Sequence, residues 1–524
     1  MKSKFRMQKA ECRNLNIRAR SLPVRFIGGP DISVFQNAGA GMRVLSVVIL
    51  LVAGLATSGA QGQAPDRSQP PHLGPPPTMK LKPIQHLKLS NGLPVLLYEK
   101  HEVPLVQMNL VLKTGAVQDP GGKGGLASMT AAMMTEGAGT RTALELADAI
   151  DFLGADLHVA AGQHTSAVVL HTPLAKLDSA LALMADVTLR PTFAAAELDR
   201  KRKERLTTLM QWRDEPRSLA SVTFNRMLFG DHPYGRYSIG DEKALRSFTP
   251  ADLKDFYQSG FGPNNATLIV VGDIVADALL PRLEKAFGAW KNVKPSTPEL
   301  SKINQVAERR VILVDKPGAA QSEIRIGRIG VPRLTEDYYA LVVMNTVLGG
   351  SFSSRLNQNL REKHGYTYGA GSRFDYRPLP GPFMASAAVQ TAVTDSSLIE
   401  FMKELKDILQ PVPDKELERA KNYVALSFPG EFQTVGDISG RLEELVIYGL
   451  PDNYFNDYIG HILAVTREDV QRVAKKYLDP EKVDIVVVGD RKQIEKNVAA
   501  LKLGPMTVMS VEDVLGKAPV LGEK

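Results

Sequence analysis

Nine histidines are the side chains of this 524-residue chain best suited to metal or acid–base chemistry. Three of them, His158, His164 and His171, fall in a segment whose pattern predicts strand, turn and strand. His158 and His164 have even spacing and would share a face if one strand continued through Gly162, but no carboxylate stands at helical spacing beside them. Neither a His-x-x-Glu-His nor a His-Glu-x-x-His motif occurs in the sequence. We therefore expect exposed or structural histidines here, not a metal site.

The elements that must position any chemistry are repeated along the chain. Thr249-Pro-Ala-Asp opens a helical stretch that leads to a strand ending at Gly272-Asp, and Thr466-Arg-Glu-Asp opens another that leads to a strand ending at Gly489-Asp. Both ends of the two copies are separated by the same 217 residues. In each copy, the threonine is suited to cap the helix, with an acid at the third position after it. Such a fixed offset predicts an internal duplication.

The two copies also begin alike, with two short apolar strands each. These strands are predicted over 95–99 and 106–112 in the first copy, and over 311–315 and 322–327 in the second. Helical patterns follow over 144–152, 174–188, 197–211 and 395–409. The prediction is an α+β protein made of two units of roughly 210 residues each, and two duplicated halves that face each other would form a clamp or chamber.

Short motifs follow one another in both halves. The first half contains Asn91-Gly-Leu-Pro-Val, Thr114-Gly-Ala, Gly125-Leu-Ala and His232-Pro-Tyr-Gly, and the second contains Leu348-Gly-Gly and the run 360–368, Leu-Arg-Glu-Lys-His-Gly-Tyr-Thr-Tyr. In this order, they resemble peptidase family M16, the pitrilysin and insulinase-like zinc peptidases. The resemblance covers about residues 83–500. It implies two tandem homologous M16-type α/β domains.

The zinc motif of that family is missing from the place where the resemblance puts it. Active members carry His-x-x-Glu-His directly after the Gly-x-Ala motif, with two histidines as zinc ligands and the glutamate as general base. Here Ser128 and Ala132 stand at the histidine positions, and Ala131 stands at the position of the base. The family's distal glutamate ligand falls near Thr208. We therefore expect no catalytic residue, no metal and no cofactor in this chain.

Arg361 and Tyr368 match an arginine and a tyrosine of the second domain of two-subunit and duplicated M16 proteases. The resemblance implies that the arginine binds substrate backbone carbonyls, while the tyrosine helps stabilise the developing oxyanion. A guanidinium is a multi-donor fork, and a phenol can donate to a developing negative charge. The alternative is structural: Arg361 would pair with a nearby acid, and Tyr368 would pack in the core.

The retained pair and the lost zinc ligands together suggest a non-catalytic subunit. Such a chain would bind unfolded peptide for a separate M16 subunit that carries the zinc, and it would not be a peptidase on its own. The stretch 157–170 is the expected sheet edge for peptide binding by strand addition. A stand-alone peptide-binding or scaffold protein is the main alternative, and an independent metallopeptidase with unrecognised ligands is a further one.

The sequence also divides into segments of different character. We expect an upstream extension over 1–41, a secretory signal peptide over 42–60 and a proline-rich linker over 61–80. The first M16-like domain would cover 81–300, the second 301–510, and a tail 511–524. Export to the periplasm or secretion follows from the signal peptide, with no stable membrane insertion after its cleavage.

The net charge of +7 comes from the first 60 residues, which carry nine Lys or Arg and two acids. The rest has 55 basic and 55 acidic residues, so no nucleic-acid partner is indicated. The single cysteine, Cys12, lies in the predicted extension, so the mature chain would form no disulfide.

Overall fold

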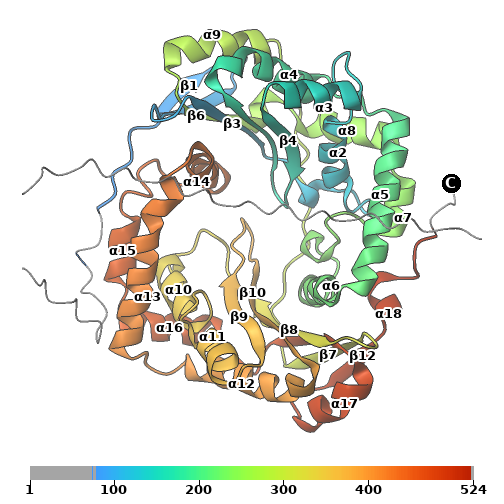
Figure 1. Ribbon diagram of the computed structural model, residues 1–524, viewed down its shortest axis with the longest axis vertical. Helices are drawn as coiled ribbons and strands as arrows, with labels where there is room; N and C mark the ends of the chain where they lie inside the picture. The colour runs from blue at the N-terminus through green and yellow to red at the C-terminus, as the bar shows by residue number, and fades with distance from the viewer. Residues whose placement is uncertain (1–73, 75–77, 521–524) are drawn as a thin grey trace, which may run out of the picture. The chain divides into compact units, whose positions relative to one another are not determined.

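A computed structural model describes residues 74 and 78–520 of the chain. The chain divides at residue 74, and the description concerns the second unit, 74–524. The predicted extension, the signal peptide and most of the proline-rich linker lie outside the described residues. Within the second unit, the predicted α+β class and the duplication are confirmed, because two six-stranded sheets are built on one plan (Figure 1).

The first sheet has the strand order β1-β2-β6-β3-β5-β4. Only β2 and β6 run parallel, and the other neighbouring pairs are antiparallel. Its strands are β1 (Gln85–Lys88), β2 (Pro94–Glu99), β3 (Leu105–Leu112), β4 (Asp156–Ala161), β5 (Ser166–Pro173) and β6 (Ala266–Gly272).

The second sheet has the order β12-β7-β11-β8-β10-β9 and repeats the parallel pair as β7 and β11. Its strands are β7 (Arg310–Asp315), β8 (Gln321–Ile329), β9 (Thr367–Phe374), β10 (Pro382–Gln390), β11 (Asp484–Gly489) and β12 (Met506–Met509). The strand that ends each repeat, β6 or β11, lies at the centre of its sheet. Both are almost completely buried, as their β-branched sequences predict.

Helices surround both sheets. Those of the first half are α2 (Leu126–Met134), α3 (Ala143–Phe152), α4 (Leu177–Leu189), α5 (Ala195–Asp214), α6 (Pro216–Phe229), α7 (Glu242–Ser247), α8 (Pro250–Gly260) and α9 (Ala276–Phe287). Those of the second half are α10 (Tyr338–Leu348), α11 (Arg355–Asn357), the π-helical turn η5 (Gln358–Lys363), α12 (Thr394–Asp407), α13 (Asp414–Ser427), α14 (Val435–Tyr448), α15 (Tyr458–Ala464), α16 (Arg467–Tyr477), α17 (Arg491–Ala500) and α18 (Val511–Leu515).

The predicted helix caps are confirmed in both repeats. The side chain of Thr249 accepts a hydrogen bond from the backbone N–H of Asp252. In return, the Asp252 carboxylate accepts a hydrogen bond from the backbone N–H of Thr249 at 2.9 Å. Thr466 and Asp469 make the same reciprocal pair at the start of α16. A capping box satisfies two of the unpaired N–H groups of the first turn, which fixes where each helix begins.

One helix of each half packs on the sheet of the other half. Helix α14 lies against β3 and β6 of the first sheet, and α6 lies against β8 and β11 of the second (Figure 1). Leu219 and Phe224 of α6 are fully buried in a cluster with Ile312 and Val488 of the second sheet. Each fully buried side chain of this size contributes about 1.5–3 kcal/mol, so this exchange holds the halves together.

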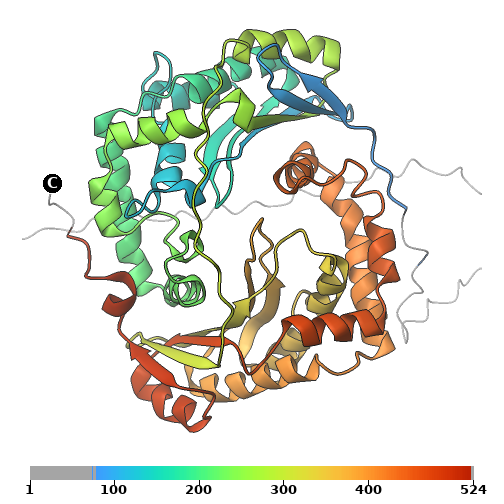
Figure 2. The same ribbon diagram turned by 180° about the vertical axis from the view of Figure 1, so that it is seen from behind.

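Two further segments connect the halves. The stretch 288–309 has no helix or strand and runs from α9 to β7 along the face seen in Figure 2. Gln305 in this stretch pairs with both backbone groups of Ile329, at 2.8 and 3.2 Å. The predicted tail begins with helix α18, whose Val514 is 1% exposed and packs beside α6. Residues 511–515 are therefore part of the folded structure.

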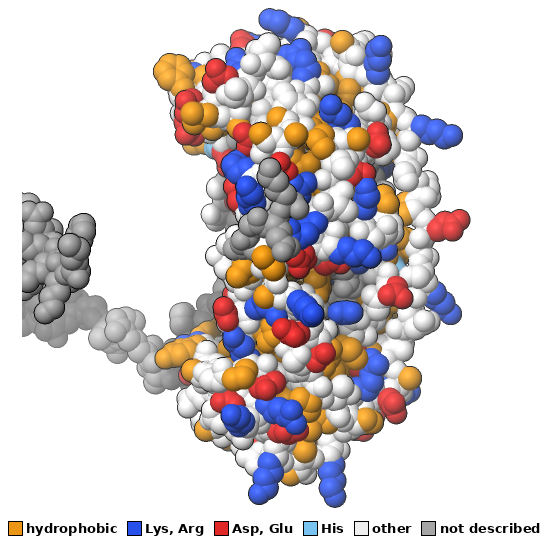
Figure 3. Space-filling model, turned by 90° about the vertical axis from the view of Figure 1, so that its right-hand side faces the viewer, with side chains coloured by type: hydrophobic (Ala, Val, Ile, Leu, Met, Phe, Trp, Pro, Cys, Tyr) orange, Lys and Arg blue, Asp and Glu red, His pale blue; other side chains and the backbone are white. Residues whose placement is uncertain are grey.

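One face of the molecule shows surface charges of both signs. On the face that carries α5, α7 and α18, basic and acidic side chains are interspersed, and hydrophobic side chains form small groups (Figure 3). Among the described residues, no helix has the length and apolar character needed to cross a membrane.

Candidate functional site

Helix α2 is the element on which the resemblance places the zinc motif. Most of its side chains are buried, but Ser128 and Ala132 are only partly buried and lie on one face, four residues apart. This is the spacing that two histidine ligands need. Ala131, at the position of the general base, is 1% exposed and belongs to the packed side of the helix.

The start of α2 is fixed by a buried carboxylate. Asp119 accepts hydrogen bonds from the backbone N–H groups of Gly125 and Ala127, both at 2.7 Å. Gly125 caps the helix with φ of 90°, a conformation that favours glycine. Burial raises the pKa of Asp119 to about 6, against the lowering effect of these N–H groups and of the charge of Arg236.

Arg205 of α5 occupies the exposed face of α2. Its guanidinium donates to the Ser128 carbonyl at 2.7 Å, to Ser128 Oγ at 2.9 Å and to the carbonyl oxygens of Ile239 at 3.1 Å and Gly125 at 3.3 Å. Burial lowers its pKa to about 10, and the charges of Asp119 and Glu204 oppose that shift. The arginine therefore stays protonated at neutral pH and ties α5 to α2.

These residues do not fit a zinc ion. Zinc sites in proteins use deprotonated or neutral ligands of the His, Cys, Asp or Glu type, and a guanidinium offers only donors and a fixed positive charge. Ser128 Oγ is already committed to Arg205 and to the Ser238 carbonyl at 2.7 Å. Among residues 78–520, no group of three or more His, Cys, Asp or Glu side chains is arranged to hold a metal.

The role of Arg205 was missed in the sequence. The expected spacing pointed to Thr208, whose hydroxyl instead donates to the Glu204 carbonyl of its own helix at 3.1 Å. Arg205 lies one turn earlier on α5, and its contacts come from α2 and from the loop at 238–239. Arg205 and Thr208 lie about one turn apart on the same helix, so counting residues from the motif could not tell which of them contacts α2.

Arg361 and Tyr368 lie in the second half of the chain, beside an edge of the second sheet. Arg361 belongs to the π-helical turn η5, and Tyr368 is the second residue of the edge strand β9. The Tyr368 side chain is 91% exposed, so it does not pack in the core. Arg361 is 38% exposed, and its ion-pair partner is the adjacent Glu362, with Nε 3.4 Å from the carboxylate.

Each sheet has two edge strands, β1 and β4 in the first and β12 and β9 in the second. β4 pairs with β5 alone, so backbone groups on its other side have no strand partner among the described residues. On the outer side of β9, the N–H groups of Ala370 and Ser372 donate to Asn357 Oδ1 at 3.3 Å and to the Gly349 carbonyl at 3.0 Å, so this edge is partly covered. Of the expected edge stretch 157–170, β4 is at the edge, whereas β5 is paired on both sides. Such an edge can bind an extended peptide through its backbone with little regard to sequence.

The three histidines examined in the sequence are not brought together in one site. The chain turns between β4 and β5, so His158 and His164 do not share a strand. His158 pairs with Asp156 at 3.1 Å on the surface, and His171 Nδ1 lies 2.9 Å from Gln107 Oε1. His164 bonds the Tyr234 hydroxyl, and burial lowers its pKa to about 4, helped by the charges of Arg377 and His232.

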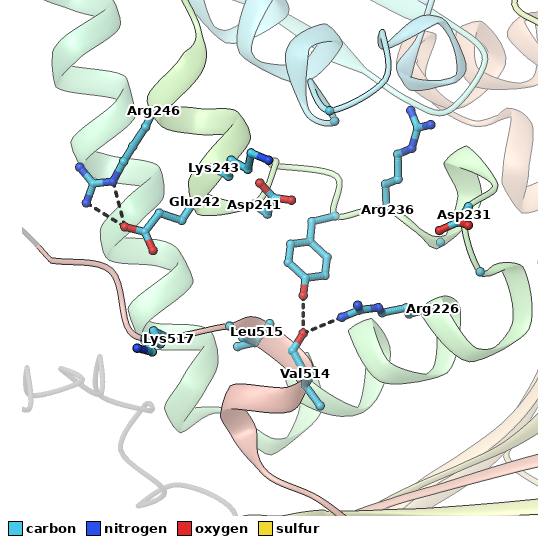
Figure 4. A pocket seen from close by; sticks show the side chains of 16 residues that line it. Arg226, Asp231, Arg236, Asp241, Glu242, Lys243, Arg246, Val514, Leu515 and Lys517 are labelled. Carbon is cyan, nitrogen blue, oxygen red and sulfur yellow. Dashed lines mark hydrogen bonds and ion pairs between the residues drawn. The ribbon is translucent and has the colours of Figure 1, made fainter.

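A cavity of about 760 Å³ lies between the first half and α18, and its wall includes Gly124 and Arg236 near the start of α2 (Figure 4). Arg226 donates to the Val514 carbonyl at 3.3 Å, and Tyr237 donates to the same oxygen. Arg246 pairs with Glu242 at 2.8 Å. The wall mixes basic and acidic side chains, and the arginines that line it are engaged with backbone or acids. Its clearest role is to seat the C-terminal segment on the first half.

Two family models match the chain in succession. The insulinase (peptidase family M16) model covers residues 94–241, and the peptidase M16 inactive domain model covers residues 247–424. A solved peptidase M16 inactive domain from Pseudomonas fluorescens is 30% identical, covers 78% of this chain and 98% of that one, and superposes with a TM-score of 0.71.

Other relatives carry two kinds of name. An uncharacterized zinc protease of Rickettsia bellii is 25% identical over 344 residues, which are 64% of this chain and 81% of that protein. A non-peptidase homolog, YmxG, of Helicobacter pylori is 23% identical over 418 residues, 78% of this chain and 95% of that protein. The periplasmic protease PqqL of Escherichia coli shares the fold, with a TM-score of 0.68 at 17% identity, and covers 85% of this chain and 51% of that one.

Proposed function

Since the chain belongs to peptidase family M16, we propose that it is the non-catalytic subunit of a zinc peptidase of this family. It binds unfolded peptide and presents it to a separate M16 chain that carries the zinc ion. One contrast carries the proposal. On α2, where the resemblance places the zinc motif, Ser128 is bound by the guanidinium of Arg205. Arg361 and Tyr368, in comparison, stay exposed at the edge of the second sheet.

The closed face of α2 supports the absence of zinc chemistry in this chain. A zinc ion at Ser128 and Ala132 would lie against the guanidinium of Arg205, and two unscreened positive charges in a partly buried site repel strongly. The chain also offers no general base there, since Ala131 is apolar and buried. Water activation must then come from the partner subunit.

The exposed pair supports a contribution to that partner. Arg361 can donate several N–H groups to the backbone carbonyls of a bound peptide, because Glu362 is its one ion-pair partner among the described residues. The Tyr368 hydroxyl can donate to an oxyanion as it develops. Neither side chain contributes much to the stability of the fold, because surface ion pairs and exposed aromatic rings contribute little.

Complex formation is the direct test. The full chain, carrying an affinity tag, is expected to co-purify with a zinc-bearing M16 chain from the same cell, and the zinc content should follow the partner and not this chain. Arg361→Ala is compared with a control, Arg373→Ala, which also removes one exposed arginine but from β9. Failure to recover any M16 partner would argue against the subunit role.

A stand-alone peptide-binding protein remains the second candidate, because the free edge of β4 needs no partner to hold an extended chain. It predicts peptide binding by this chain alone that tolerates both Arg361→Ala and Tyr368→Phe. Sensitivity of the binding to Arg361→Ala would favour the subunit role instead.

We also propose that the protein works in the periplasm. The predicted signal peptide over 42–60 supports this, and the structurally similar PqqL is described as periplasmic. N-terminal sequencing of the exported protein tests it. The expected mature chain begins at Gln61, and a mature chain that begins earlier would contradict cleavage at that site.

A further inference from the structure

The π-helical turn that carries Arg361 is fixed to helix α12 by a buried side chain. Asn359, two residues earlier in η5, donates through Nδ2 to Glu404 at 2.6 Å and to Glu400 at 2.8 Å, and both carboxylates belong to α12. Asn359 and Glu404 are buried. A π-helical turn is rare in proteins and is frequent at functional sites, and these bonds stabilise this unusual geometry.

The side chain of Arg361 is held from the front by an aromatic ring. The guanidinium carbon lies 4.7 Å from the centre of the Phe352 ring, within the range of a cation–π contact. The Phe352 side chain is 61% exposed, so the contact does not arise from burial in the core. A guanidinium that rests with one face on a ring keeps its N–H groups free in its own plane.

The loop that carries Phe352 is fastened to the strand that carries Tyr368. Asn357, which is buried, donates through Nδ2 to the Phe352 carbonyl at 2.7 Å, and its Oδ1 accepts from the backbone N–H of Ala370 at 3.3 Å. Ala370 is two residues beyond Tyr368 in β9. One amide side chain therefore relates the aromatic ring beneath Arg361 to the strand of the tyrosine.

We propose that Phe352 is a positioning residue for Arg361. Its ring fixes the plane of the guanidinium relative to Tyr368, so that the arginine is already oriented when a peptide backbone arrives. The inference rests on the proposed function of Arg361 and Tyr368 and names a residue that the family resemblance did not. Preorganisation of this kind lowers the entropic cost of binding, so it should act on substrate affinity more than on turnover.

The test uses the peptidase activity of the mixture with the zinc-bearing M16 chain. Phe352→Leu, which keeps an apolar side chain but removes the ring, is expected to raise KM about two- to fivefold with kcat unchanged, the range for an exposed cation–π contact. Phe352→Tyr should restore the parent KM. Phe152→Leu on α3, where the ring is 84% exposed, is the matched control and should change neither constant.

A double-mutant cycle separates positioning from a general structural effect. In an Arg361→Ala background, Phe352→Leu should have no further effect on KM, because the group that the ring orients is gone. An equal rise in KM in both backgrounds, or no rise in either, would overturn the proposal.

The binding of a labelled unfolded peptide to this chain alone gives a second readout. There, Phe352→Leu should weaken binding by the same factor, again only when Arg361 is present. An inactive mixture with this binding pattern intact would contradict the subunit role but not the positioning role. Loss of the binding pattern would overturn the positioning role itself.

Discussion

Replacing Arg205 by methionine tests whether this arginine closes the zinc-motif helix. Methionine keeps the length and apolar stem of the side chain but removes all donors. Of the four acceptors, Gly125 O keeps a helical hydrogen bond from Met129 at 2.9 Å, and Ser128 Oγ keeps its contact with Ser238. The hydrogen bonds from Arg205 to the carbonyl oxygens of Ile239 and Ser128 are lost without replacement.

The expected loss of stability follows from these bonds. A hydrogen bond to a charged donor contributes about 1.5–3 kcal/mol, and two of them are lost, while removal of a buried charge returns part of the cost. A net loss of about 3 kcal/mol is therefore expected. With an unfolding entropy of about 2.1 cal/mol/K per residue over roughly 450 residues, this corresponds to a fall in Tm of about 3 °C.

Thermal unfolding of parent and variants, followed by circular dichroism, measures this difference. Lys203→Met on the same helix is the control, since Lys203 is exposed, and its Tm should stay within about 1 °C of the parent. Arg205→Lys should fall between the two, because a single ammonium cannot reach all the carbonyls. An Arg205→Met variant as stable as the Lys203→Met control would refute the idea that Arg205 holds α5 to α2.

Three further outcomes follow from the same structure. Restoring the motif by Ser128→His, Ala131→Glu and Ala132→His should give no stoichiometric zinc while Arg205 remains, and close to one zinc ion per chain when Arg205→Glu is added; zinc retained after dialysis by the first variant would contradict this. The free energy of unfolding should fall as pH drops from about 6.5 to about 4, because His164 has its pKa lowered to about 4 and the unfolded chain binds the proton first. His164→Gln should reduce the total loss over this range by about 1–3 kcal/mol, and an unchanged loss would exclude His164 as its source. Tyr368→Phe should leave Tm within about 1 °C of the parent, since the side chain is 91% exposed, while it lowers activity of the mixture with the zinc-bearing chain; a large fall in Tm would show a structural role.

Local features of the fold could be predicted well from the sequence. The strands over 95–99 and 311–315 match β2 and β7 closely, and the threonine caps of α8 and α16 follow from side chains three residues apart. Periodicity and capping are properties of a short stretch of chain, so the sequence contains them directly. The fixed offset between the copies likewise predicted the internal duplication, which the two sheets of one plan confirm.

Contacts between distant segments could not be predicted in this way. The sequence pattern of α6 or α14 shows an apolar face but not which sheet it covers, and each packs on the sheet of the other half. In the sequence, Arg205 is one of several basic residues of a strongly polar helix, and only the fold shows that it contacts α2. The exposure of Tyr368 also depends on β9 being the last strand of its sheet.

The central claim is that this chain contributes to peptide hydrolysis only together with a zinc-bearing M16 partner. The measurement that tests it most directly is cleavage of an unfolded peptide in the presence of zinc, by this chain alone and by its mixture with that partner. The account predicts no cleavage by the chain alone, and cleavage by the mixture whose kcat/KM is lowered, but still measurable, with Arg361→Ala and unchanged with Arg373→Ala. Cleavage by the chain alone would contradict the account.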